Sequence, residues 1–158
     1  MVASKPEKSL RVALWAGYED ALAPIAARLP ANARKYALAA WHCDVTDHRC
    51  IHDAWIEAIS VVEGGSGPRK EKRSLGVVIR LLGAHHDRYL ILKFPGVRRY
   101  LIEHPLMEEQ RRNVAHGDVL DDSIQLTSDG AILYSLRMEF GRVEIEAKDV
   151  EFSQLPIS

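Results

Sequence analysis

The stretch that decides the fold is DSIQLTSDGAILYSLRMEFGRVEIEAKDVEF, which runs from Asp122 to Phe152. Two turn signals, at residues 128–130 and at Gly141, divide it into runs in which apolar and polar residues alternate. Neighbouring side chains of a strand point to opposite faces, so such runs have one apolar face. We predict a three-stranded antiparallel meander with this face in the core. The face consists of Ile132, Tyr134, Leu136, Met138, Phe140, Val143, Ile145 and Ala147.

Similar runs rich in Val, Ile or Leu precede this stretch, namely WIEAISVV (55–62), SLGVVIRLL (74–82) and RYLILKF (88–94). GAHHD, between the last two, has hairpin length. GVRRYLIEHP (96–105) is compatible with a short strand or a helical turn, and the break at Lys148-Asp149 with a bulge or a strand end. No strand-helix-strand alternation demands a parallel sheet. The sequence therefore predicts one mostly antiparallel sheet of about six strands.

The first third of the chain has helical spacing of its apolar residues. This spacing predicts one helix that begins near Asp20 and ends at Pro30, and a second that Asn32 caps. The expected buried positions are Leu22, Ile25, Ala26 and Leu29 in the first helix, and Tyr36, Leu38, Ala39 or Ala40 in the second. The predicted fold class is α+β, with two N-terminal helices packed on the sheet.

Composition and charge limit the function classes. A chain of 158 residues, 47% hydrophobic and 27% charged, is typical of one folded domain. We expect a single domain over 1–158, helical in 1–50 and β in 51–158. Lys and Arg number 21 against 22 Asp and Glu, which disfavours nucleic acid as a partner. No run approaches the roughly 20 apolar residues that span a membrane. Two cysteines fit a reducing, cytoplasmic location.

The stretch WHCDVTDHRCIHD (41–53) is rich in residues that can bind a metal. In an extended conformation, His48, Cys50 and His52 share one face; in a helix, Asp44 aligns with the two histidines instead. The stretch lacks the paired Cys-x-x-Cys and His-Glu-x-x-His spacings of known metal motifs. We interpret it as a hydrated loop and keep the metal site as the alternative. The basic run PRKEKR (68–73) is likewise expected to be a hydrated connection.

A second polar cluster, HHDR (85–88), falls in the predicted hairpin. His86 and Asp87 could meet His52 and Asp53 at one end of the sheet and form an acid–base or metal-binding group. The interpretation that we prefer is a hydrogen-bonded corner that joins strand ends. The acidic pairs Asp121-Asp122 and Glu108-Glu109 are expected to be surface charge, because adjacent residues point to different faces. The irregular stretch 104–117 is a candidate contact surface.

Three segments carry a resemblance to a known group of proteins: IHDAWIEAI (51–59), LLGAHHDRYLILKFPGVRRY (81–100) and LRMEFGRVEIEAKDVEF (136–152). Together they resemble small uncharacterised bacterial proteins with a Leu-His-Asp-Ser/Ala-Trp start and a terminal hairpin. The plan is similar to that of some immunity-type proteins of bacterial toxin systems, which act by binding and carry no catalytic residues. The resemblance places His52, Asp53 and Trp55 in the start motif and Asp149 at the last acidic position. His42, Cys43, His48 and Cys50 match nothing in it.

We therefore expect a non-catalytic protein-binding module, immunity-like or regulatory, whose partner is another protein and which needs no cofactor. Its candidate binding residues are His52, Asp53, Trp55, His86, Asp87 and Arg88. The alternative is a metal-dependent or His-dependent hydrolase built from His48, Cys50, His52, His86 and Asp87. A homodimer through the exposed edge of the strand at 55–62 is a further expectation.

Overall fold

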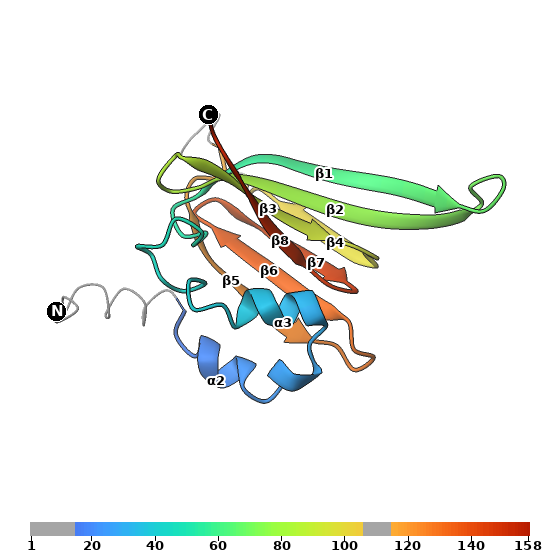
Figure 1. Cartoon of the computed structure of the whole chain (residues 1–158), viewed down its shortest axis with the longest axis horizontal. Helices are drawn as coiled ribbons and strands as arrows, with labels where there is room; N and C mark the ends of the chain where they lie inside the picture. The colour runs from blue at the N-terminus through green and yellow to red at the C-terminus, as the bar shows by residue number, and fades with distance from the viewer. Residues whose placement is uncertain (1–14, 106–114) are drawn as a thin grey trace.

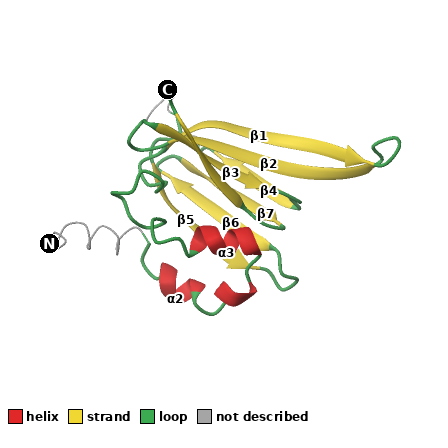
Figure 2. Cartoon of the chain, in the orientation of Figure 1, coloured by secondary structure: helices red, strands yellow, loops and turns green. Residues whose placement is uncertain are grey.

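The strands form two antiparallel sheets of four strands each, rather than the single sheet of about six that the alternation predicts (Figure 1). The computed structural model describes residues 15–105 and 115–158. The class, α+β with antiparallel strands, is as predicted (Figure 2). The first sheet has the order β1-β2-β3-β8 and the second the order β4-β7-β6-β5. The strands are β1 (Trp55–Ser66), β2 (Lys72–Leu82), β3 (Arg88–Phe94), β4 (Arg99–Glu103), β5 (Val119–Leu126), β6 (Ile132–Met138), β7 (Gly141–Ala147) and β8 (Glu151–Pro156).

The chain passes from one sheet to the other twice at neighbouring places, from β3 to β4 and from β7 to β8. These two crossings explain why two sheets form instead of the single sheet that was predicted. Lys93 pairs with Glu151 at the end of the β3–β8 ladder, and Arg99 pairs with Glu146 at the start of the β4–β7 ladder. Residues 95–98 and 148–150 make the bends between them. The break after Ala147 is therefore a strand end. The strand β8 that follows is exposed at most positions, so it lacks the alternation that would reveal it.

The inner faces of the two sheets form one core. The apolar face predicted for the meander is buried in β6 and β7, with Phe140 half-buried as the exception. In the first sheet the buried residues are Val77, Ile79, Leu81, Leu90, Leu92 and Phe94. The rings of Phe94 and Tyr134 meet across the sheets with centroids 5.0 Å apart. The parity of the alternation thus identified the core face correctly.

The helical part is shorter than predicted and covers one side of the sheets. It consists of α2 (Tyr18–Leu22), a 3-10 turn (Ala26–Arg28) and α3 (Ala31–Ala37); α2 contacts β5 and α3 contacts β8 (Figure 1). Leu22 and Leu29 are buried as expected, but in α3 the buried residues are Ala33, Tyr36 and Ala37, and Leu38 is exposed. None of these helices, in the part of the chain that the structure describes, has the length and apolarity to cross a membrane.

Asn32 does not cap α3 as predicted, because it lies inside the helix and Pro30 occupies the cap position. The carboxylate of Asp149, in the bend between β7 and β8, takes the capping role. It accepts hydrogen bonds from the backbone N–H groups of Ala33 (2.7 Å) and Asn32 (3.3 Å). Proline offers no side-chain acceptor for these free N–H groups, so a residue distant in sequence supplies it.

Candidate binding surface

A buried carboxylate, Asp122, joins the helical part to the second sheet. It accepts hydrogen bonds from the hydroxyls of Tyr36 (2.6 Å) and Tyr134 (3.0 Å), and it pairs with His42 Nε2 at 2.8 Å. Trp15 Nε1 approaches the same carboxylate at 3.4 Å. The prediction that Asp122 is surface charge is therefore wrong. Its neighbour Asp121 does lie at the surface, where it binds the guanidinium of Arg137.

A β-bulge at the start of β5 determines which of the two acidic residues is buried. Val119 pairs with Met138 and Asp121 with Arg137, so Leu120 is an extra residue in β5. Without the bulge, Asp121 would share the inner face with Val119; with it, Asp122 and Ile124 do. The parity that Asp122 shares with Ile124 and Leu126 was the sequence signal that could have identified it as a core residue.

Hydrogen bonds and burial shift the pKa values of Asp122 and of the two tyrosines in this network. Both ring nitrogens of His42 lie near oxygen atoms: Nδ1 is 3.2 Å from the Tyr36 carbonyl and Nε2 is 2.8 Å from the Asp122 carboxylate. Burial alone would raise the pKa of Asp122, but the charge of His42 and the hydrogen bonds from His42, Tyr36 and Tyr134 outweigh it and lower that pKa. Burial, followed by the charge of Asp122, raises the pKa of Tyr36 and of Tyr134 well above the usual range.

This network is suited to a structural role rather than to chemistry on a substrate. The side chains of His42 and Asp122 are 2% and 0% exposed, and each polar atom of the group has a protein partner. A fully satisfied buried network fixes one packing arrangement. It accordingly holds the helical part in place on β5 and β6.

The residues of the proposed metal site have separate partners. Cys50 is buried and its thiol donates to the His42 carbonyl. His48 pairs with Asp87 at 2.7 Å, and His52 lies 3.0 Å from the Leu120 carbonyl through Nδ1. Within residues 15–105 and 115–158, no three His, Cys, Asp or Glu side chains are grouped so as to hold a metal ion. Burial raises the pKa of the Cys50 thiol to about 12, which opposes the thiolate that a nucleophile needs.

The six candidate binding residues do not form one cluster: Asp87 and Arg88 are in one group, Trp55 and His86 in a second, and His52 and Asp53 form a separate pair. Asp87 accepts two hydrogen bonds from Arg88 and one ion-pair contact from His48, whose ring stacks on His85 with centroids 3.8 Å apart. Trp55 meets His86, with ring centroids 4.6 Å apart. His52 and Asp53 pair with each other at 3.2 Å rather than with His86 and Asp87.

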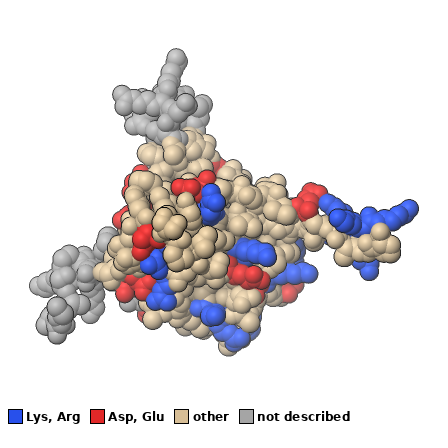
Figure 3. All heavy atoms as spheres, turned by 45° about the horizontal axis from the view of Figure 1, so that its top comes forward, with Lys and Arg blue, Asp and Glu red and all other residues tan. Residues whose placement is uncertain are grey.

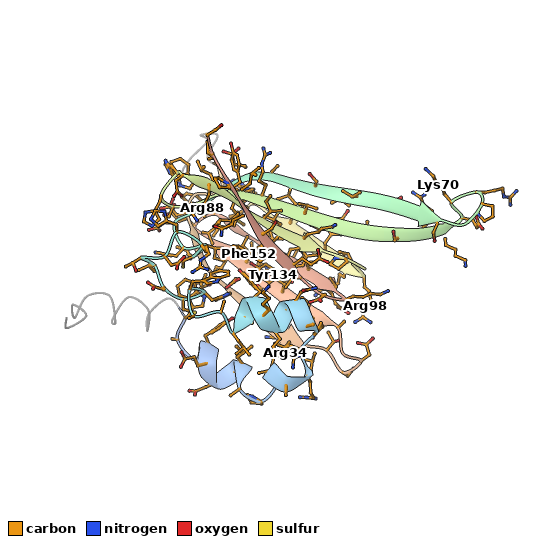
Figure 4. The ribbon with its side chains drawn as sticks, in the orientation of Figure 1. Arg34, Lys70, Arg88, Arg98, Tyr134 and Phe152 are labelled. Carbon is orange, nitrogen blue, oxygen red and sulfur yellow. The ribbon has the colours of Figure 1, made fainter. Side chains whose placement is uncertain are left out.

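These contacts form a corner between chain segments. Arg88, which is labelled in Figure 4, also donates to Gln154 of β8 at 2.7 Å. Trp55 Nε1 donates to Asp118, just before β5, at 2.6 Å. Hydrogen bonds from Arg88 and then from His48 lower the pKa of Asp87, which keeps this carboxylate charged. The geometry agrees with the hydrogen-bonded corner that we preferred from the sequence, although it uses His48 in place of His52.

The β1–β2 hairpin extends well beyond the rest of the first sheet (Figure 1). β1 and β2 remain paired from Val62–Gly76 to Ser66–Lys72, whereas the β2–β3 ladder ends at Val77–Phe94. We call residues 62–76 the hairpin arm. The predicted strand end at Val62 is wrong, because β1 continues to Ser66. The predicted loop PRKEKR is confirmed for residues 68–71, whereas Lys72 and Arg73 belong to β2.

The end of the hairpin arm is cationic. It carries Arg69, Lys70, Lys72 and Arg73, all exposed, against two acidic residues, Glu63 and Glu71. Figure 3 shows these blue side chains gathered on the projection, and Figure 4 places Lys70 at its far end. Arg73 has a loose ion pair with Glu63 at 3.6 Å. The arm is thus a local positive feature on a chain of net charge −1.

β1 also has an open edge. It is the first strand of its sheet, with β2 as its one neighbour, and past Trp55 no described residue pairs with its outer side. Val61 and Val62, which point to opposite faces of the ribbon, are 42% and 52% exposed. Both faces and one edge of the arm are therefore available to a partner. The candidate contact surface at 104–117 lies largely outside the described residues, as does Glu108-Glu109.

Comparisons of the chain with protein-family models, with curated proteins and with solved structures find no match.

Proposed function

We propose that this chain is a non-catalytic protein-binding module, and that the hairpin arm and the outer edge of β1 are its binding element. The observation that carries the proposal is a two-stranded ribbon that projects past β3 with both faces and an edge uncovered. A two-stranded ribbon on its own is marginally stable in water. Contact with a partner accounts for a projecting ribbon better than a role in the core does.

The partner that fits is a protein with an acidic segment in an extended conformation. Such a segment can add to the β1 edge through backbone hydrogen bonds, as in other cases of strand addition. Acidic side chains would face Arg69, Lys70 and Lys72 at the arm end, which favours fast association and discriminates against basic partners. The resemblance to immunity-type proteins supports binding as the activity. A cytoplasmic location is part of the proposal, because a chain with two cysteines suits a reducing compartment.

Site-directed photo-crosslinking in source cells tests this proposal. A photoreactive residue at Val62 on the arm is compared with one at Lys93, which is exposed on β3. We expect one defined protein to be captured at Val62 and not at Lys93, and to bind the purified chain in a salt-dependent manner. Equal capture at both positions, or no capture at Val62, would contradict the proposal.

Self-association is the competing use of the same edge. Sedimentation of the purified chain separates the two, with Val62→Lys as the variant, because a charged residue on an edge strand prevents pairing. A monomer with or without the substitution is expected. A dimer that Val62→Lys dissociates would assign the edge to a second copy and overturn the assignment to a different protein.

A further inference from the structure

A cavity of about 320 Å³ lies between the C-terminal half of α3 and the start of β8, on a different part of the molecule from the hairpin arm. Aromatic and aliphatic side chains line most of it, with a few polar groups at the opening. The volume is at the small end of the range for ligand sites, and this mixture of lining groups is typical of them. The cavity therefore has room for one small ring system.

Its aromatic wall is held rigidly. The ring of Phe152 lies 4.6 Å from that of Trp41 and 5.6 Å from that of Tyr36, measured between centroids. Tyr36 is fixed in turn by its hydrogen bond to Asp122, and the guanidinium of Arg49 lies 5.3 Å from the Trp41 ring. Figure 4 shows Phe152 on β8, beside the helical part. A flat ring can stack here without reordering the wall.

The charges at the opening are unequal in their surroundings. Lys35 on α3 and Glu151 on β8 both line the cavity and are exposed. Glu151 lies directly opposite Lys93 in the β3–β8 ladder, where cross-strand side chains are neighbours. Lys35 has no ion pair with any residue of the described ranges. Glu151 has no ion pair in these ranges either, but Lys93 is its cross-strand neighbour and offsets part of its charge, so the cation available to a ligand is the ammonium of Lys35.

We propose that this cavity binds a flat aromatic molecule that carries one carboxylate. Its ring stacks on Trp41 and Phe152, and its carboxylate pairs with Lys35 at the opening. The volume of about 320 Å³ fits a small molecule, and the cavity shares no lining residue with the hairpin arm.

Three probes that share an indole ring test the proposal by calorimetry: indole-3-acetate, its neutral amide and the cationic tryptamine. We expect indole-3-acetate to bind most tightly, the amide more weakly and tryptamine weakest. Lys35→Gln should reduce the preference for the acetate over the amide to less than about twofold. Arg34→Gln, the adjacent exposed residue that does not line the cavity, should leave the order and the affinities unchanged.

The location is tested by NMR, with Phe152→Leu as a variant that keeps an apolar side chain. Indole-3-acetate should shift the indole signal of Trp41, and Phe152→Leu should weaken all three probes while the protein stays folded. Tighter binding of tryptamine than of the acetate would overturn the charge assignment. No shift at Trp41 with millimolar indole-3-acetate would overturn the site.

Discussion

The helical end and the hairpin arm are built in opposite ways. At the helical end, segments too short to be stable alone are held by contacts between residues distant in sequence, such as Tyr36 and His42 with Asp122. In the hairpin arm each strand contacts little but its partner, and most side chains are exposed. This difference shows that buried contacts with the Asp122 carboxylate stabilise the helical end. The hairpin arm has few such contacts, and its exposed side chains are accessible to a partner.

The largest effect is expected at the helical end. Asp122→Ala should lower the free energy of unfolding by about 3–5 kcal/mol, because it leaves the His42 ring and two tyrosine hydroxyls buried without their partner. Urea unfolding measures the change. Asp121→Ala is the matched control: its ion pair with Arg137 is at the surface and should contribute no more than about 1 kcal/mol. Equal losses for the two variants would contradict the assigned roles.

The same carboxylate predicts a loss of stability in acid. The pKa of Asp122 is lower in the folded state than its usual value, so its stabilising contribution is present above about pH 4. This contribution is lost as the pH falls through the lowered folded-state pKa, where the carboxylate becomes protonated. Urea unfolding of the wild type and Asp122→Asn should therefore differ most near neutral pH and converge in acid. A difference that is constant with pH would show that the charge of Asp122 is unimportant.

A smaller effect is expected at the start of α3. Asp149→Ala removes the acceptor for the N–H groups of Asn32 and Ala33 and should cost about 1 kcal/mol, with an upper limit of about 2 kcal/mol. Thermal unfolding is the measurement. Glu144→Ala, a substitution of another half-buried acidic residue on β7, should change the stability less. The cap assignment is wrong if Asp149→Ala is the more stable of the two.

The smallest effect on stability is expected at the hairpin arm. Replacing Arg69, Lys70 and Lys72 with Glu should change the free energy of unfolding by no more than about 0.5 kcal/mol, because these side chains are exposed. Amide hydrogen exchange should also separate the regions: the amides of residues 64–73 should exchange through local opening, and those of β6 only on global unfolding. Slow exchange throughout the arm would contradict its independence from the core.

The sequence was sufficient to predict the meander but not the division of the strands into two sheets. In Ile132–Met138 the alternation is complete, so the buried face could be assigned residue by residue. β8 could not be predicted, because most of its positions are exposed and the bend before it has no strong turn signal. The glycines at 64, 65 and 67 concealed the continuation of β1, since glycine is usually unfavourable in a strand.

The site residues illustrate a second limit. Asp122 shares its parity with Ile124 and Leu126, which indicated the inner face, but the bulge that moves Asp121 off that face has no mark in the local sequence. The pairing of His48 with Asp87 joins segments 39 residues apart, which depends on how the loop after α3 packs against the β2–β3 turn. Residue type alone suggested a polar corner, but the choice of partners depended on the tertiary structure.

The measurement that tests the central claim most directly is the affinity of the protein captured at Val62 for two forms of the purified chain. The forms are the wild type and the variant with Glu at positions 69, 70 and 72. If the hairpin arm is the binding element, the variant should remain folded and bind at least tenfold more weakly, about 1.4 kcal/mol. Equal affinity for both forms would contradict the claim.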